Sequence, residues 1–164
     1  MQATAAKAQV SPDVLAQHLF AVLGYLVRAT TPDMFRALGE LDLSMTQVKL
    51  LYALDDPERE LSLKDLGEEL NLSLPAVSRA IDALNERGYV DRREHEQDRR
   101  MKRVRITSAG TGAIAQLNRT RLAQLEEFAA TMTEPERRRL AGALAFLLKR
   151  PEIAAVKPDP QAAR

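Results

Sequence analysis

The sequence predicts a mainly α-helical protein with one small β-sheet, and two observations lead to this fold class. Within residues 60–110, two short amphipathic segments flank a three-residue turn, and a charged segment with the alternation of a β-hairpin follows. Outside this region, helix-patterned segments lie at both ends of the chain. With 4% aromatic residues and no tryptophan, the composition suits helices packed through aliphatic side chains. Together these features predict a winged helix-turn-helix with flanking helices and a two- to three-stranded wing.

The length of 164 residues suits one domain with a buried core. We expect a single domain over residues 1–164. Its winged-helix lobe should span about 44–108, with dimerisation helices at 12–38 and 108–150 and a tail at 151–164. The two outer helical parts carry more apolar surface than one such domain can cover.

The first helix is expected from about residue 12 to 30, starting after Ser11 with Pro12 in its first turn. Its apolar residues spread around most of the circumference, so it must be covered on more than one side. Thr31-Pro32 is expected to interrupt it, which leaves the residues up to about 41 in a continuation or a loop.

The second helix begins at a capping box, the sequence SMTQ at residues 44–47, and should run to about Leu54. Residues 60–61 fit a short strand. The first helix of the helix-turn-helix then starts at Ser62 and should end near Leu70.

Residues 71–73 form the predicted turn, and the second helix of the motif should run from 74 to about 87. Ser73 is its expected cap, and Gly88 is expected just past its end. Four apolar residues spaced i, i+3, i+7 and i+10 should form its inner face, namely Leu74, Val77, Ile81 and Leu84.

The predicted wing consists of strands at 89–93 and 101–107 around a polar loop at 94–100. A long helix should follow to about Met132. A second capping box, TEPE at residues 133–136, opens the last helix, which should reach about Lys149 before a frayed, proline-containing tail.

Charge is unevenly distributed although the net charge is only +1. Residues 91–105 hold seven Lys and Arg against four Asp and Glu, whereas residues 55–69 hold seven acids and two basic residues. The local sign governs contact with phosphate more than the sum does, so the wing is the expected cationic element.

The second helix of the motif is a candidate for insertion into the major groove of DNA. Its outward residues are small apart from one arginine: Ser73, Pro75, Ala76, Ser78 and Arg79. Small side chains let a helix sit deep in a groove about 12 Å wide, where Arg79 can reach a guanine edge or a phosphate. Lys64, in the first turn of the preceding helix, is placed to contact the DNA backbone. The alternative for Arg79 is a solvated side chain paired with Asp82 or Glu86.

The wing is the candidate for a minor-groove contact. Asp98, Arg99 and Arg100 should lie at its tip, and Lys102 follows on the returning strand with two further arginines. The planar, weakly hydrated guanidinium group suits a narrow minor groove. Asp98 would orient an arginine before binding. The alternative is a soluble hairpin of mixed charge.

These residues resemble a known family. The sequence LSLKDLGEELNLSLPAVSRAIDALNERGYVDRR, followed by QDRR and VRITSAG, is similar to the MarR family of bacterial winged-helix transcriptional regulators over about residues 44–110. The resemblance implies a homodimer joined by its first and last helices that binds double-stranded DNA at a pseudo-palindromic operator. It also implies a repressor released by a small aromatic or anionic ligand. Gly67 is a departure, because relatives usually have alanine there.

Candidates for a ligand cleft between the first two helices are Tyr25, Phe35 and Tyr52, with Arg28 to pair an acid. The alternative is that these rings pack in the core or in the dimer seam. Both alternatives stay open at the level of sequence.

Other function classes find little support. The chain has no cysteine, hence no disulfide or thiolate metal site, and its two histidines, His18 and His95, form no catalytic or metal cluster. No phosphate-binding glycine loop occurs, so we expect no enzyme, cofactor or metal. The sequence has no recognisable signal peptide. No apolar run approaches the roughly 20 residues of a bilayer span. We therefore expect a cytoplasmic protein without a membrane partner. The competing function is a winged-helix protein-interaction module that does not bind DNA.

Overall fold

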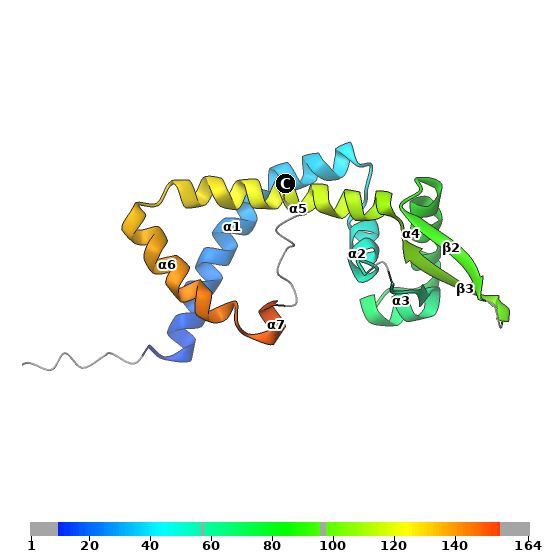
Figure 1. Ribbon diagram of the computed structural model, residues 1–164, viewed down its shortest axis with the longest axis horizontal. Coiled ribbons are helices and arrows are strands. Elements are labelled where there is room, and N and C mark those ends of the chain that lie inside the picture. Colours follow the sequence, from blue (N-terminus) through cyan, green and yellow to red (C-terminus); the bar gives the residue numbers. More distant parts are fainter. Residues whose placement is uncertain (1–9, 57, 96–97, 155–164) are drawn as a thin grey trace, which may run out of the picture.

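The structure is a computed structural model that describes residues 10–56, 58–95 and 98–154 (Figure 1). The predicted mainly helical winged-helix fold is confirmed. Its elements, in chain order, are α1 (Pro12–Glu40), α2 (Met45–Ala53), β1 (Leu61–Ser62), α3 (Leu63–Leu70), α4 (Leu74–Glu86), β2 (Val90–His95), β3 (Asp98–Ile106), α5 (Ser108–Ala130), α6 (Glu134–Leu147) and α7 (Pro151–Ala154).

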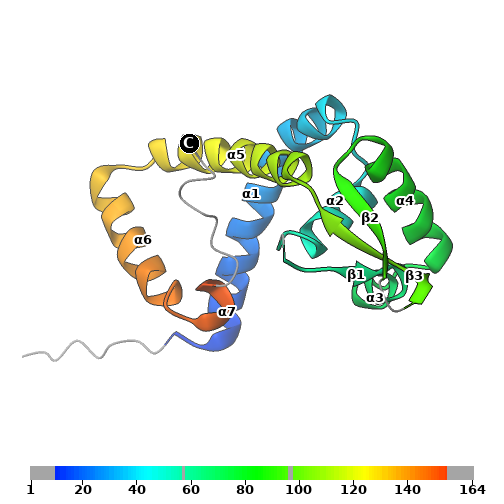
Figure 2. The same cartoon turned by 45° about the vertical axis from the view of Figure 1, so that its right-hand side comes forward.

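The elements form a lobe and an open helical arm, which α5 joins. Helices α2, α3 and α4 and the sheet make up the lobe at one end, whereas α6, α7 and the first part of α1 extend at the other (Figures 1 and 2). Helix α5 starts on the lobe and packs along α1. The lobe is therefore held at one end of the long helix α5.

The core lies in the lobe and beneath the first half of α5. Its fully buried large side chains come from α2, α3, α4, the sheet and α5: Leu50, Leu51, Leu54, Leu66, Val77, Ile81, Leu84, Val90, Val104 and Leu117. In contrast, α6 buries no residue, and Phe20 on α1 is 79% exposed. The chain alone leaves the apolar sides of both outer helices uncovered.

The sheet is antiparallel with the order β1-β3-β2. Its two long strands extend further than predicted, because β2 reaches His95 and β3 begins at Asp98, so the predicted loop at 94–100 is wrong. The alternation of apolar residues ends earlier, but the backbone pairing continues, with Glu94 opposite Lys102 and His95 opposite Asp98.

Helix α1 continues through Pro32, where the sequence predicts an interruption. The hydroxyl groups of Thr30 and Thr31 donate to the Val27 carbonyl at 3.3 and 2.6 Å, in the turn where Pro32 contributes no backbone N–H. The helix changes direction partway along its length (Figure 1). The proline therefore bends the helix without ending it.

Helix α1 also corrects the expectation that no segment is apolar enough to span a bilayer. By length and composition, α1 is long and apolar enough to cross a membrane, with a mean hydropathy of 1.2 over an 18-residue window. None of that window is buried within the chain. One such helix is weak evidence for a membrane segment. A helix that buries several sides against other protein has the same composition.

The chain after α6 differs slightly from the predicted frayed tail. A short helix, α7, follows Arg150, whose carbonyl accepts from the backbone N–H groups of Ile153 and Ala154 at 3.0 and 2.9 Å. Residues 155–164 lie outside the described part of the chain.

The junction between the wing and α5 depends on close backbone packing. Thr107 donates its hydroxyl to the Gly88 carbonyl at 2.6 Å and its N–H to the Tyr89 carbonyl at 3.1 Å. The same hydroxyl accepts from the N–H of Gly110 at 3.2 Å. A Cβ atom on Gly110 would collide with the Tyr89 carbonyl oxygen and lie 2.7 Å from Cγ1 of Ile106. Only glycine fits here without a shift of backbone.

Gly110→Ala should therefore lower the free energy of unfolding by about 1–3 kcal/mol, the range for overpacking a well-packed site. Gly112→Ala is the matched control, because it lies on the same helix and its Cβ would meet nothing within 4 Å. That control should raise the free energy by up to about 1 kcal/mol through helix propensity. Urea denaturation at one protein concentration measures both, and equal shifts would contradict the packing assigned to Gly110.

Candidate nucleic-acid interface

The helix-turn-helix is fixed by local hydrogen bonds at each of its ends. At the start of α3, Ser62 and Asp65 form the reciprocal capping box, with N···O distances of 3.0 and 3.1 Å. The backbone hydrogen bond from Ser62 is the main reason that the pKa of Asp65 lies below its usual range. At the end of α3, Asn71 adopts a left-handed conformation with φ of 52°. These bonds set the direction in which α4 leaves the turn.

The turn between α3 and α4 also accounts for Gly67. Its carbonyl accepts from the N–H of Leu72 at 2.8 Å, and a Cβ atom on it would lie 3.0 Å from the Leu72 carbonyl oxygen. The glycine thus permits a closer approach of the turn to α3 than alanine would.

The five small or basic residues predicted on the outward side of α4 lie there. Ser73, Pro75 and Arg79 are exposed, and Ala76 and Ser78 are half-buried. The Ser73 side chain makes no capping hydrogen bond, so the N–H groups of the first turn stay available. Among the described residues, Arg79 has no ion-pair or hydrogen-bond partner, and the alternative of a bond to Asp82 or Glu86 is not seen. The outward side of α4 therefore presents one unengaged guanidinium group among small side chains.

Leu74 is the exception on the inner face of α4. Val77, Ile81 and Leu84 are fully buried as predicted, whereas Leu74 is 55% exposed. Its place in the first turn puts it beyond the packed part of α4, on the edge of an open groove of about 350 Å³ between α3 and α4. The lining residues are Leu63, Lys64, Gly67, Glu68, Asn71, Leu72 and Leu74.

Lys64 borders this groove from the first turn of α3. Its Nζ lies 3.7 Å from Oε1 of Glu68, and both side chains are exposed. An exposed pair of this kind contributes little to stability, so Lys64 can exchange its partner for a phosphate at small cost.

An ion pair joins the wing to α4. Arg92 on β2 places Nη1 2.5 Å from Oδ1 of Asp82 on α4, and the other carboxylate oxygen accepts weakly from the Ser78 hydroxyl at 3.4 Å. Nε and Nη2 of Arg92 are buried and have no acceptor among the described residues. Arg92 is therefore a structural cation. The sequence does not indicate this role, because Arg92 stands there only among the many basic residues of the wing.

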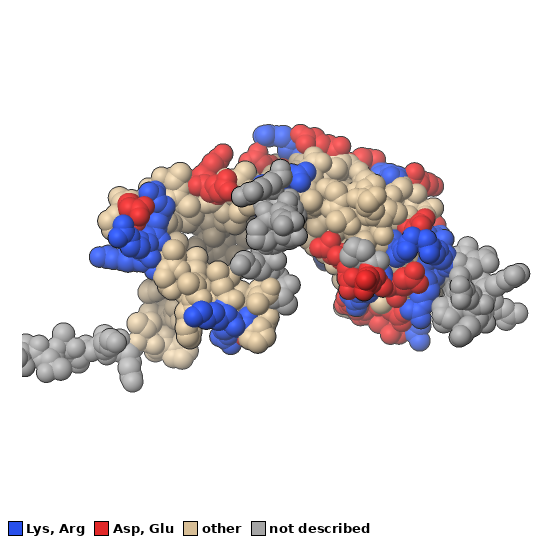
Figure 3. All heavy atoms as spheres, viewed as in Figure 1, with Lys and Arg blue, Asp and Glu red and all other residues tan. Residues whose placement is uncertain are grey.

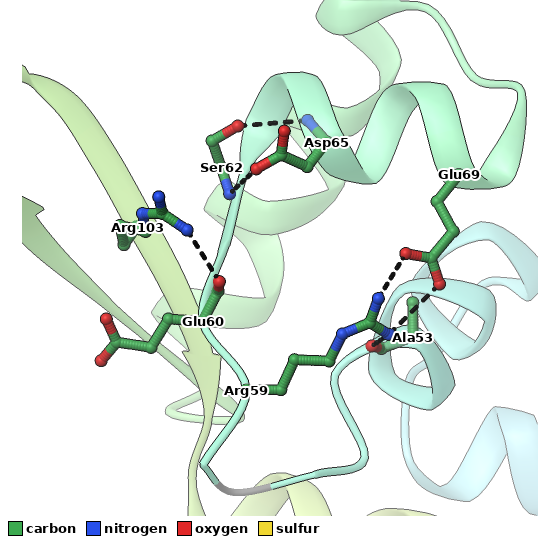
Figure 4. A network of polar contacts seen from close by, with 7 residues as sticks. All are labelled: Ala53, Arg59, Glu60, Ser62, Asp65, Glu69 and Arg103. Atoms are coloured by element: carbon green, nitrogen blue, oxygen red, sulfur yellow. Dashed lines mark hydrogen bonds and ion pairs between the residues drawn. The ribbon is translucent and has the colours of Figure 1, made fainter.

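Other basic residues at the base of the wing are also used for folding. Arg103 on β3 donates to the Glu60 carbonyl at 3.0 Å, and Arg105 lies 3.7 Å from the carboxylate of Asp91. Figure 4 shows the network around this contact, in which Arg59 pairs with Glu69 at 2.7 Å and donates to the Ala53 carbonyl at 2.8 Å. These bonds tie β1, α3 and the end of α2 to the returning strand.

The predicted contacts at the wing tip fall on side chains outside the described part of the structure: Asp98, Arg99, Arg100 and Lys102. Their backbone belongs to β3. In Figure 3, several basic side chains lie at the right-hand end of the lobe, with acidic side chains next to them.

The four candidate ligand residues do not meet at one point along α5. Tyr25 packs on Phe128 with ring centroids 5.4 Å apart. The Tyr52 hydroxyl donates to Oδ1 of Asn118 at 2.7 Å, and Arg121 lies 5.8 Å from its ring centroid. Burial raises the pKa of Tyr52, and the charge of Arg121 opposes this shift.

Of the other two ligand candidates, Arg28 is exposed and Phe35 is 64% exposed on α1. In the part of the chain that the structure describes, no group of three His, Cys, Asp or Glu side chains could hold a metal ion.

Replacement of Asp82 by alanine should lower the free energy of unfolding by about 1–3 kcal/mol, because it leaves the largely buried Arg92 without its carboxylate partner. Glu86→Ala, one turn further along α4 and exposed, is the control and should stay within about 0.5 kcal/mol of the parent. Thermal denaturation compares the two. A loss of the same small size in both variants would show that the ion pair contributes nothing to the attachment of the wing.

Comparison with known proteins agrees with this architecture. The sequence model of the MarR family matches residues 43–102, the helix-turn-helix and most of the wing. The chain is similar to YdgJ of Bacillus subtilis, an uncharacterized HTH-type transcriptional regulator, with 31% identity over 103 residues. That match covers 63% of this chain and 62% of YdgJ, so the chain spans less than two thirds of the length of the curated relatives it matches.

Solved structures share the fold over most of the chain. Tm0710 from Thermotoga maritima, a transcriptional regulator, has a TM-score of 0.71 at 18% identity, covering 87% of this chain and 99% of Tm0710. A MepR mutant from S. aureus, solved bound to an oligodeoxyribonucleotide, has a TM-score of 0.61 at 21% identity, covering 81% of this chain and 95% of MepR. The MarR family model and the similarity to YdgJ agree over the winged-helix region, and the solved structures share the same fold.

Proposed function

We propose that this protein is a DNA-binding transcriptional regulator of the cytoplasm, in which α4 enters the major groove and the wing meets the adjacent minor groove. The observation that carries the proposal is the outward side of α4, where Arg79 has no partner among the described residues although Asp82 lies close by in sequence. The carboxylate of Asp82 is occupied by Arg92, which leaves Arg79 free for a ligand. The oligodeoxyribonucleotide bound to MepR, which shares this fold, supports the same use.

The regulator is a homodimer in this proposal. Large apolar side chains on α1 and α6 are uncovered, and a patch of this kind on a soluble protein marks an interface. An isologous pair presents two α4 helices, so the operator is a pseudo-palindrome with half-sites about one helical turn apart.

We also propose that a small aromatic or anionic ligand releases the protein from DNA, so that the protein acts as a repressor. Arg28 is exposed with no ion-pair partner among the described residues, and Phe35 is an exposed ring on the same helix. Tyr52 already contacts α5 through Asn118. A ligand that engaged Arg28 and Tyr52 would act on the packing of α1 and α2 against α5.

Binding of a duplex should be detectable by mobility shift and should weaken as salt rises, because phosphate contacts release counterions. Arg100→Ala should lower the log–log salt slope by roughly 1 for each half-site without unfolding the protein. Circular dichroism provides the folding control. If the parent binds no duplex at either of two salt concentrations, the chain is a protein-interaction module and the proposal is wrong.

Arg79→Ala should relax sequence choice at one symmetric pair of base positions, because a bidentate contact with guanine discriminates by about 1–3 kcal/mol. Selection from random duplexes, performed with the parent and the variant, compares the two consensus sites. Recovery of the parent consensus by the variant, with every site weakened equally, would assign Arg79 to phosphate instead.

Light scattering at micromolar concentration should return twice the chain mass of 18.2 kDa. The expected cause is burial of the apolar sides of α1 and α6 between two chains. A mass of one chain at high concentration would contradict the dimer.

A further inference from the structure

We propose that Leu74 reads the 5-methyl group of thymine, so that each half-site of the operator carries a thymine where the first turn of α4 enters the major groove. This inference rests on the proposed function and adds a base preference that Arg79 does not supply. It assigns to Leu74 a role in specificity in place of the role in the core that its spacing predicts.

Leu74 is more exposed than its position in the apolar stripe of α4 predicts. The three other apolar residues of its stripe are fully buried, whereas Leu74 is 55% exposed at the first position of α4. Leu63 and Leu72 flank it in the groove between α3 and α4, and the exposed Pro75 ring follows it. Leu74 is thus an exposed apolar side chain with two further leucines beside it in the groove.

The second step is the direction in which this side chain faces. Residues three and four apart are neighbours on a helix, so Leu74 stands between the buried Val77 and the half-buried Ser78. Ser78 belongs to the outward side of α4, and Lys64 borders the same groove from α3. Leu74 therefore lies at the edge where the packed side of α4 meets the side proposed to enter DNA, with a cation beside it for the backbone.

The third step is the chemistry of the partner. The edges of base pairs in the major groove are polar except for one group, the C5-methyl of thymine, which binds apolar side chains. A leucine carries no donor or acceptor, so guanine, adenine and unmethylated cytosine give it nothing to replace the water that it displaces. Thymine is therefore the base that complements Leu74, as guanine complements Arg79.

The experiment removes the methyl group and nothing else. The consensus duplex that the parent selects from random DNA is prepared with each thymine replaced in turn by deoxyuridine, and affinity is measured by fluorescence anisotropy at one salt concentration. Burial of one methyl group corresponds to about a fourfold change in affinity. In the parent, one symmetric pair of thymines should show a loss of about this size for each half-site.

Variants then connect the lost methyl group to Leu74. Leu74→Ala should bind the thymine and uracil duplexes equally, whereas Leu74→Met, which keeps an apolar side chain, should retain the preference. Met45→Ala is the matched control, because Met45 also occupies the first position of its helix and is 47% exposed. That control should show the full preference of the parent.

The possible results distinguish a failure of the role given to Leu74 from a failure of the proposed DNA binding. If the parent protein binds its duplex and loses no affinity at any uracil position, recognition of thymine is wrong, whereas DNA binding is not affected. A preference for thymine that persists unchanged in Leu74→Ala overturns the assignment to Leu74. If the parent binds no duplex, the proposed function fails first, and the inference fails with it.

Discussion

The ion pair between Asp82 and Arg92 is the contact on which the geometry of the proposed interface depends. It joins the middle of α4 to the first strand of the wing, the two elements assigned to different grooves of DNA. Nε and Nη2 of Arg92 are buried without acceptors among the described residues, so Asp82 is the carboxylate that pairs with this guanidinium group there. A contact between the helix and the wing that exists before binding lowers the cost of ordering one relative to the other.

The same contact explains how a protein with a net charge of +1 can present a basic face. Its cations divide into those that hold the fold and those that are available. Arg92, Arg103 and Arg105 have partners at the base of the wing, whereas Arg79 on α4 has none among the described residues. Asp82 and Asp91, two acids close to this surface, are paired with Arg92 and Arg105. The position of the basic surface therefore depends more on which side chains are paired than on the net charge of the chain.

Features that depend on local hydrogen bonds could be predicted from the sequence. The capping boxes predicted at Ser44 and Thr133 form, α3 begins after Ser62 as expected, and Gly88 has a positive φ of 72° just after α4. Each of these depends only on residues within one turn. The outward residues of α4 were predictable for the same reason, since a helical period places them once its buried side is known.

Features that depend on contacts between distant parts of the chain were not predictable. Leu74 is exposed because its place in the first turn lies beyond the packed part of α4, which its spacing alone does not show. The role of Arg92 needs the position of β2 against α4. Helix α1 continues through Pro32, although the local pattern predicts an interruption there. In each case the local pattern fits two outcomes, and tertiary packing selects between them.

The central claim is that one rigid lobe contacts the major groove through α4 and the minor groove through the wing. Methylation interference with dimethyl sulfate tests it most directly, because the reagent modifies guanine at N7 in the major groove and adenine at N3 in the minor groove of the same duplex. The account predicts interference at guanine N7 in two positions about one helical turn apart, with interference at adenine N3 on their flanks. A duplex that is bound equally well whatever its guanine N7 methylation would contradict insertion of α4.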